Sequence, residues 1–120
     1  MARHQALLKA PPKTVFQFLS DPTLLEEISR WKVDGPDTMA VGTAWIERRG
    51  LRRRTWTVTT YDRRGLAFSI EGPVAVTFAC KKGGPGSCNV QMDVAGDPKA
   101  VARFERTDGD RLDRLAAWLA

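Results

Sequence analysis

Between Thr43 and Val94, apolar and polar residues alternate with a period of two, and this pattern limits the fold more than any other feature of the chain. Successive side chains of a β-strand point to opposite faces of its sheet, so the alternation is typical of strands with one buried face. Turns that contain Gly or Pro divide the stretch into separate strands, which favours an antiparallel sheet. The five predicted strands cover residues 43–49, 52–61, 66–71, 74–81 and 87–94.

The register of this predicted sheet follows from the partners that it brings together. Pairing the first two strands around Gly50 places Trp45 opposite Trp56 and Glu47 opposite Arg54. One face of the sheet then becomes continuously apolar, and a slip of one residue would destroy this separation. The same register through the later turns gives these further neighbours: Val58 level with Phe68 and Val76, Phe78 opposite Val90, Val76 opposite Met92, and Cys80 opposite Cys88.

The first twenty residues indicate a strand followed by a helix. Residues 3–9 alternate weakly and fit a strand. Pro11 and Pro12 then open a helix, because proline is tolerated in the first helical turn. The letters "SDP" at residues 20–22 end this helix, since the residue before a proline avoids the helical conformation.

A second short helix is predicted next. Thr23 and Glu26 have the spacing of a capping box, which marks a helix start at Thr23. Its inward residues are Leu24 or Leu25, Ile28 and Trp31. Residues 32–42, which include "VDGPDT", have the composition of a loop.

Residues 97–119 predict a C-terminal helix that begins with Asp97 as cap and Pro98 in the first position. Asp108 lies on the apolar stripe of this helix and is followed by Gly109, which costs about 1 kcal/mol in a helix interior. The stripe keeps its phase across this pair, so we expect one bent helix rather than two separate ones. The stripe consists of Val101, Phe104, Leu112, Leu115 and Leu119.

This order of elements resembles the helix-grip plan of the START-like (SRPBCC) superfamily, and most of all its small bacterial polyketide cyclase/dehydrase and lipid-transport branch. The resemblance is carried by "APPKTVFQFLSDPTLLEEISRW" (10–31), "VGTAW" (41–45), the run of strands and the C-terminal helix. It implies an α+β fold over one domain, residues 1–120, with a curved antiparallel sheet of about six strands around the C-terminal helix. The matching residues form a packing pattern and carry no catalytic signature.

The resemblance also implies a cavity between the sheet and the C-terminal helix. The residue pattern alone favours a filled core, and the resemblance shifts the expectation towards a cavity for a hydrophobic or amphipathic molecule: a lipid, a polyketide-like compound or an isoprenoid. Aromatic and Met side chains suit such adaptable apolar contacts. The predicted ligand-binding residues are Trp45, Glu47, Arg54, Trp56, Phe68, Val76, Phe78, Met92, Phe104, Asp108 and Leu112.

Three charged residues within this set allow two interpretations. In a cavity, Arg54 would orient a polar headgroup while Glu47 holds it in place, but the pair more commonly forms a solvated ion pair at a sheet rim, worth about 0.2–1 kcal/mol. Asp108 is either an acid–base group with a raised pKa or, more commonly, a residue that faces water at a helix break. The alternative function is therefore a cyclase or dehydratase that uses Asp108 or Glu47. The catalytic residues stay unassigned, because the sequence contains no recognisable catalytic set.

The stretch "IERRGLRRRTWTV" (46–58) concentrates the positive charge of the chain. Seven arginines between Glu47 and Arg64 face two acidic residues, and the rest of the chain is neutral. Strand parity places Arg52 and Arg54 with the tryptophans and Arg53 with the threonines, which argues against a nucleic-acid groove with all arginines on one face. We expect a charged hairpin at the cavity rim, and a further alternative is a module that binds an acidic headgroup or acidic protein through residues 48–54. The arginines available for this are Arg48, Arg49, Arg52 and Arg53.

Other classes of site find little support. His4, Cys80 and Cys88 make neither a metal-ligand set nor a disulfide framework, so no metal and no cofactor are predicted. No apolar run approaches the roughly 18 residues of a membrane span, and the first ten residues lack the apolar stretch of a signal peptide. We therefore expect a cytoplasmic protein that is a monomer or a homodimer.

Overall fold

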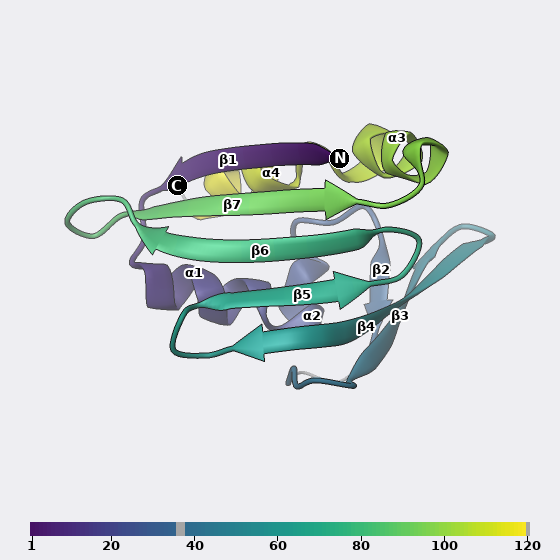
Figure 1. Cartoon of the computed structure of the whole chain (residues 1–120), viewed down its shortest axis with the longest axis horizontal. Helices are drawn as coiled ribbons and strands as arrows, with labels where there is room; N and C mark the ends of the chain where they lie inside the picture. The colour runs from purple at the N-terminus through teal and green to yellow at the C-terminus, as the bar shows by residue number, and fades with distance from the viewer. Residues whose placement is uncertain (36–37, 120) are drawn as a thin grey trace.

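The computed structural model describes residues 1–35 and 38–119, and its centre is one antiparallel sheet in the order β1-β7-β6-β5-β4-β3-β2 (Figure 1). Each strand pairs antiparallel with its neighbours, as the period-two alternation predicted. The strands are β1 (Ala2–Leu8), β2 (Lys32–Asp34), β3 (Ala44–Arg49), β4 (Arg52–Asp62), β5 (Ala67–Glu71), β6 (Ala75–Lys82) and β7 (Cys88–Ala95).

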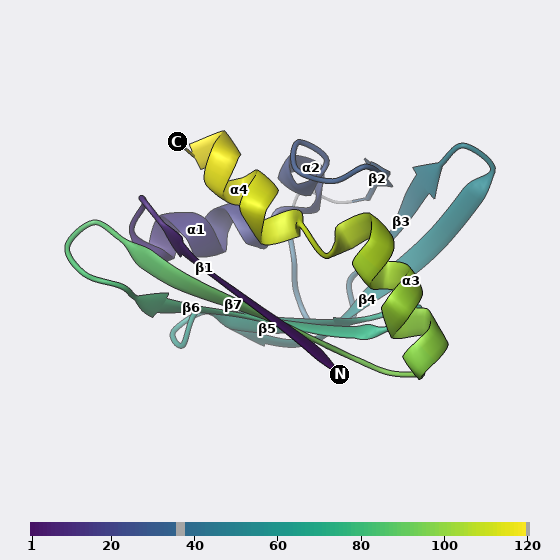
Figure 2. The same cartoon turned by 90° about the horizontal axis from the view of Figure 1, so that it is seen from above.

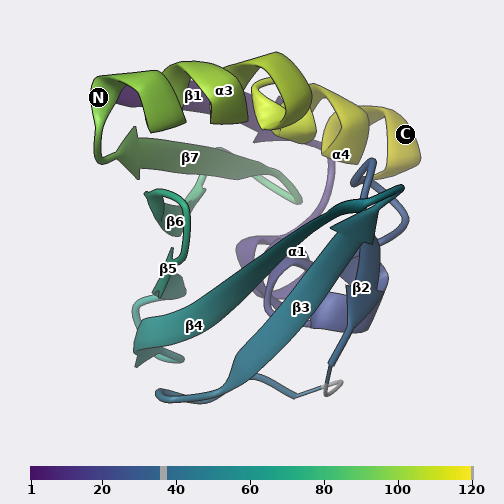
Figure 3. The same ribbon diagram turned by 90° about the vertical axis from the view of Figure 1, so that its right-hand side faces the viewer.

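Within the described residues, four helices lie on one face of the sheet, which curves around them. They are α1 (Pro12–Leu19), α2 (Pro22–Leu25), α3 (Pro98–Asp108) and α4 (Arg111–Leu119). Figure 2 shows all four helices on the same side of the sheet. Figure 3 shows that the sheet is curved and that α3 lies opposite the β3–β4 hairpin. The predicted α+β helix-grip fold is confirmed, and the sheet has a seventh strand.

That seventh strand, β2, was not predicted. Val33 lies in the segment 32–42, whose composition indicated a loop, and it pairs with Glu47 of β3. The strand is only three residues long, and its alternation is too short to distinguish from loop sequence. Part of the predicted loop, residues 36 and 37, lies outside the described residues.

The predicted register of the β3–β4 hairpin is confirmed. Trp45 pairs with Trp56 and Glu47 pairs with Arg54. Gly50 sits in the turn with a φ of 60°, a left-handed conformation that glycine adopts without steric cost. The hairpin therefore places two tryptophans and one ion pair together on the concave face.

The register is wrong in the three later hairpins. Between β5 and β6, Phe68 pairs with Phe78 rather than with Val76, which pairs with Ile70. Val58 pairs with Ile70 rather than Phe68, because the ladder shifts between Val58 and Thr60 and the turn after Asp62 is longer than predicted. Asp62 folds this turn by accepting hydrogen bonds from the backbone N–H groups of Arg64 and Gly65. The last hairpin is displaced by two residues, so the observed neighbours are Phe78 with Met92, Val76 with Val94, Cys80 with Val90, and Lys82 with Cys88.

A displacement by two residues keeps every side chain on its predicted face. The apolar face of the sheet is therefore buried as expected, although several partners change. The tight turn at residues 83–87 lets β6 and β7 pair for longer than the composition suggested, because Gly84 and Gly86 adopt positive φ angles there.

The N-terminal helices differ in how well the sequence defined them. Helix α1 has Pro12 in its first turn and ends at Leu19, as predicted. Helix α2 begins one residue earlier than predicted, because Asp21 rather than Thr23 caps it through the backbone N–H of Thr23. It spans four residues, and Leu25 is the inward leucine while Leu24 is exposed.

The C-terminal segment is two helices, so the expected single bent helix is wrong (Figure 2). Helix α3 ends at Asp108, and Arg30 reaches the break by donating to the carbonyl oxygen of Thr107 and to Asp110. A Cβ atom on Gly109 would lie 2.6 Å from the carbonyl oxygen of Glu105, so a side chain at this position would force a local shift. Specific polar contacts and a steric requirement thus define the break.

Candidate functional site

A buried cluster of charged side chains joins the β3–β4 hairpin to α3 and α4. Glu47 of β3 accepts hydrogen bonds from the indole N–H groups of Trp45 and Trp56, at 3.2 and 2.8 Å. The Nε atom of Arg54 donates to the same carboxylate at 2.7 Å. The register of the hairpin brings these four side chains together, so local sequence determines this half of the cluster.

The other half of the cluster comes from the end of α3. Arg54 donates through both terminal nitrogens to Asp108, at 2.9 and 3.0 Å, in a two-pronged ion pair. Asp108 also accepts hydrogen bonds from Thr107, at 2.6 Å, and from Arg111, at 2.9 Å. Glu47, Arg54, Asp108 and Arg111 thus form an electrically neutral group, here called the charge tetrad.

The charge tetrad is buried, and each member exposes between 1% and 9% of its surface. The Cζ atom of Arg54 lies 4.0 Å from the ring centroid of Trp31 and 5.1 Å from that of Trp56. Phe104 lies close to both arginines, at 5.7 Å from Arg54 and 5.9 Å from Arg111. Aromatic rings therefore lie close to the same two guanidinium groups that the carboxylates bind.

The environment lowers the pKa of Asp108 to about 2. Burial by itself raises the pKa of this carboxyl, and the hydrogen bond from Arg54 together with the charges of Arg111 and Arg54 more than reverses that effect. Asp108 is therefore ionised at neutral pH and holds no proton to donate.

Two expectations about these charged residues are corrected. The Glu47–Arg54 pair was expected as a solvated rim pair and is instead buried beneath Trp31 and Phe104. Asp108 was expected to face water at a helix break; the break exists, but the side chain points inward to Arg54. Arg111 was missed, and its spacing of three residues after Asp108 was the available signal.

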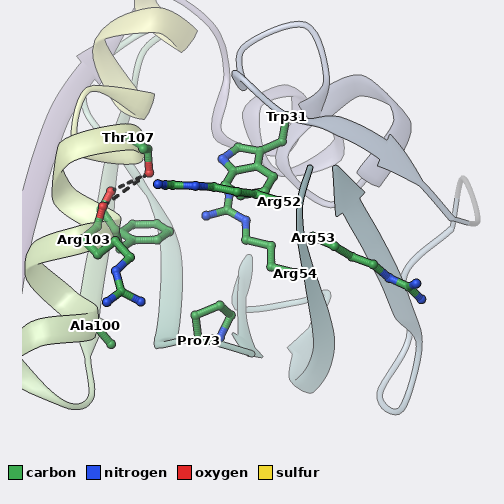
Figure 4. Close-up of a pocket in the computed structure, with 9 residues that line it drawn as sticks. Trp31, Arg52, Arg53, Arg54, Pro73, Ala100, Arg103 and Thr107 are labelled. Atoms are coloured by element: carbon green, nitrogen blue, oxygen red, sulfur yellow. Dashed lines mark hydrogen bonds between the residues drawn. The ribbon is translucent and has the colours of Figure 1, made fainter. Parts of the chain in front are cut away.

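A cavity of about 500 Å³ lies beside the charge tetrad, between α3 and the β3–β4 hairpin. Figure 4 shows its walls, with Ala100, Arg103 and Thr107 on α3 facing the arginines of β4. Its volume falls within the range of about 300–1,000 Å³ that is usual for small-molecule sites. The lining residues are Trp31, Arg52, Arg53, Arg54, Pro73, Ala100, Arg103, Phe104 and Thr107.

Three consecutive arginines of β4 occupy different environments around this cavity. Arg52 extends across the cavity towards α3, Arg53 points away from it, and Arg54 is buried in its floor (Figure 4). Strand parity predicted that Arg53 points to the opposite face from Arg52 and Arg54, but not that Arg52 and Arg54 differ. Within residues 1–35 and 38–119, no acidic side chain lies within ion-pair distance of Arg52 or of Arg103 on α3.

The cavity overlaps only partly with the predicted ligand-binding set. Arg54 and Phe104 line it, while Trp45, Trp56, Glu47 and Asp108 lie in or against the adjoining tetrad. The remaining predicted residues belong to the packed core and line neither of the two cavities described here: Phe68, Val76, Phe78, Met92 and Leu112. The apolar pattern did not distinguish a core position from a cavity wall, because both require apolar side chains.

A second cavity of about 350 Å³ lies at the other end of the sheet, against α1. Its lining includes Lys13, Tyr61 and Arg63, and it does not adjoin the charge tetrad. No group of three or more His, Cys, Asp or Glu side chains in the described part of the chain is placed to hold a metal ion. None of the described helices is both long enough and apolar enough to span a bilayer.

Comparison with known proteins identifies the family. The family model described as polyketide cyclase/dehydrase and lipid transport matches residues 2–118. The chain belongs to this family. Among curated proteins, none matches this chain.

Several solved structures share the fold of this family member although their sequence identity to it is low. The Aha1 dimer from Colwellia psychrerythraea is 16% identical, with a TM-score of 0.76 over 99% of this chain and 96% of its own. DynU16, a putative protein in the dynemicin biosynthetic locus, is 19% identical, with a TM-score of 0.73 over 98% of this chain and 46% of its own. The di-domain ARO/CYC StfQ from the steffimycin biosynthetic pathway is 13% identical, with a TM-score of 0.73 over 99% of this chain and 45% of its own.

Proposed function

We propose that this protein binds a hydrophobic or amphipathic small molecule in the cavity between α3 and the β3–β4 hairpin. The observation that carries the proposal is the cavity of about 500 Å³ beside Trp31 and Phe104. Membership of a polyketide cyclase/dehydrase and lipid transport family supports a lipid, a polyketide-like compound or an isoprenoid as the class of ligand. The aromatic walls supply broad apolar contact without selecting one shape.

The proposal places the ligand nearer the cavity mouth than the sequence suggested. Phe68, Phe78 and Met92 pack in the core, so a ligand would contact Trp31, Pro73, Ala100 and Phe104 instead. Arg54 is the member of the charge tetrad that lines the cavity, and its ion pair with Asp108 holds α3 at a fixed place relative to β4. Its role in this proposal is to position the wall of the cavity.

An acid–base role for Asp108 or Glu47 receives no support from this geometry. Asp108 has a pKa of about 2, so at neutral pH it has no proton to donate and is a poor proton acceptor. Both oxygens of Glu47 accept hydrogen bonds from Trp45, Trp56 or Arg54. Binding is therefore the function that we propose, and cyclisation or dehydration would need groups other than these two.

Titration with N-phenyl-1-naphthylamine, a neutral dye that fluoresces in apolar sites, tests the proposal. Ala100→Trp fills the cavity from α3 and should abolish dye binding, because Ala100 lines the cavity. Ala102→Trp is the matched control, because Ala102 lies on the same helix, is exposed and does not line the cavity. If the wild type binds the dye and both variants bind it equally well, the dye binds outside this cavity. No binding by the wild type, either of this dye or of its anionic analogue 1-anilinonaphthalene-8-sulfonate, would contradict the proposal.

A second candidate function is attachment of the β3–β4 hairpin to an anionic surface. Leu51 is fully exposed at the tip of the hairpin, and the flanking Arg48 and Arg49 are also exposed. An exposed apolar residue among arginines suits a membrane that carries acidic headgroups. Flotation with vesicles of phosphatidylglycerol and phosphatidylcholine tests this, and Leu51→Ser with Arg48→Ser and Arg49→Ser should abolish it. Equal flotation of this variant would rule the candidate out.

A further inference from the structure

We propose that the ligand of this cavity is an anionic amphiphile whose acidic group binds between Arg52 and Arg103. This inference rests on the proposed function, and it adds the chemical class of the ligand. The acidic group is a carboxylate, a phosphate or a sulfonate, attached to an apolar or aromatic body. The body contacts Trp31 and Phe104, and the acidic group lies nearer the solvent.

The first argument is the charge around the cavity. Arg54 does not supply the anion site, because Glu47 and Asp108 already compensate its charge within the neutral tetrad. Arg52 and Arg103 line the same cavity and have no acidic partner among the described residues. A neutral ligand would partly dehydrate these two guanidinium groups without replacing the lost water, whereas an anion compensates both.

The second argument is geometric. Arg52 projects from β4 and Arg103 from α3, so the two side chains reach the cavity from opposite walls (Figure 4). A guanidinium group presents several N–H donors in a planar fork that matches the oxygens of a carboxylate or phosphate. In Figure 4 the Arg52 guanidinium lies at the level of Thr107 and that of Arg103 lies nearer Ala100. In this proposal the acidic group lies between them, accepts from both forks and joins two elements that the cavity separates.

The third argument is an unpartnered donor in the apolar wall. The buried indole N–H of Trp31 makes no hydrogen bond within the described residues, although the side chain is more than nine-tenths buried. In Figure 4 the indole nitrogen faces α3 across the cavity. An unpaired buried donor is costly, so an oxygen atom of the ligand that accepts from Trp31 would remove this cost. An amphiphile with oxygen near its acidic end supplies such an acceptor.

The test compares two dyes with a similar aromatic body. 1-Anilinonaphthalene-8-sulfonate carries a negative charge, and N-phenyl-1-naphthylamine lacks it. We expect the anionic dye to bind at least about tenfold more tightly at low salt, with an affinity that falls as salt is added. Arg52→Gln and Arg103→Gln should each weaken the anionic dye by about tenfold, the size expected for one hydrogen bond to a charged group. Each should change the affinity for the neutral dye by less than about twofold.

Two exposed basic residues of α3 serve as matched controls. Lys99→Gln and Arg106→Gln each remove a positive charge from the same helix as Arg103, and neither residue lines the cavity. Both controls should bind the anionic dye like the wild type. Equal loss in the controls and in the Arg52 and Arg103 variants would overturn the inference, because only the general positive charge would then matter.

The outcomes separate this inference from the proposed function. If the neutral dye binds as tightly as the anionic one, the anionic class is wrong and the proposed cavity function stands. If neither dye binds, the proposed function fails, and this inference fails with it.

A competition experiment distinguishes acidic amphiphiles from a neutral one of the same chain length. Laurate and dodecyl phosphate should displace the bound anionic dye, and dodecanol should not. Displacement by dodecanol as effective as that by both acids would also overturn the inference.

Discussion

Arg52 and Arg54 lie two residues apart on the same strand and face the same side of the sheet, yet their environments are opposite. Arg54 is buried, forms ion pairs with Glu47 and Asp108, and is covered by Trp31. Arg52 is exposed at the cavity and has no acidic partner in the described part of the chain. The difference indicates that Arg54 holds the fold together, while Arg52 is available to a ligand.

The largest effect on stability should come from replacing Arg54, the buried arginine of the two. Arg54→Met leaves Glu47 and Asp108 buried without their shared cation, and we expect a loss of about 3–5 kcal/mol in the free energy of unfolding. Urea denaturation measures it. The control Arg53→Met, on the outer face of the same strand, should change stability by less than about 0.5 kcal/mol. Similar losses in the two variants would mean that the charge tetrad is not a stabilising unit.

The pH dependence of stability sharpens the same point. The pKa of Asp108 is lowered in the folded protein from 3.8 to about 2, so the unfolded chain takes up this proton first. The resulting stabilisation, about 2 kcal/mol, is complete above pH ~4 and is lost as the pH falls towards 2. Asp108→Asn should remove this part of the slope.

Exposed carboxylates also contribute to the slope, because hydrogen bonds from Arg3 and Arg30 lower the pKa of Asp93 and Asp110. The informative quantity is therefore the difference in slope between wild type and Asp108→Asn, measured by urea denaturation at a series of pH values from 5 to 2. Identical slopes would show that Asp108 does not carry the stabilisation assigned to it.

A smaller effect is expected at the helix break that positions Asp108. Alanine usually stabilises a helix relative to glycine by about 1 kcal/mol. At Gly109 we expect the opposite sign, a loss of about 1–3 kcal/mol, because the new Cβ would lie 2.6 Å from the carbonyl oxygen of Glu105. Thermal unfolding of Gly109→Ala measures this, and an increase in stability would mean that the break tolerates a side chain.

The smallest effects should occur on the unpaired side. Arg52→Gln and Arg103→Gln should each change the free energy of unfolding by less than about 0.5 kcal/mol, because neither residue forms an ion pair within residues 1–35 and 38–119. Calorimetry of the ligand-free proteins checks this. A loss above 1 kcal/mol in either variant would give that arginine a structural role and weaken the comparison.

Much of the fold followed from local sequence. The alternation between Thr43 and Val94 predicted five strands and the buried face, and the pairing of Trp45 with Trp56 followed from the short turn at Gly50. The later hairpins were placed less well, because the shift near Val58 and the long turn after Asp62 have weak sequence signals. The site was predicted in part: Glu47, Arg54 and Asp108 were singled out, whereas Arg103 and Arg111 were not.

The sequence by itself determined which side chains share a face, because the periods of strands and helices are fixed by backbone geometry. It therefore placed Glu47 beside Arg54, and Asp108 in line with the apolar stripe of its helix. Only the tertiary structure decided that these residues meet, since Arg54 and Asp108 are 54 positions apart in the chain. The same long-range packing decided which arginines are neutralised in the charge tetrad and which line the cavity, because that depends on the place where α3 crosses the sheet.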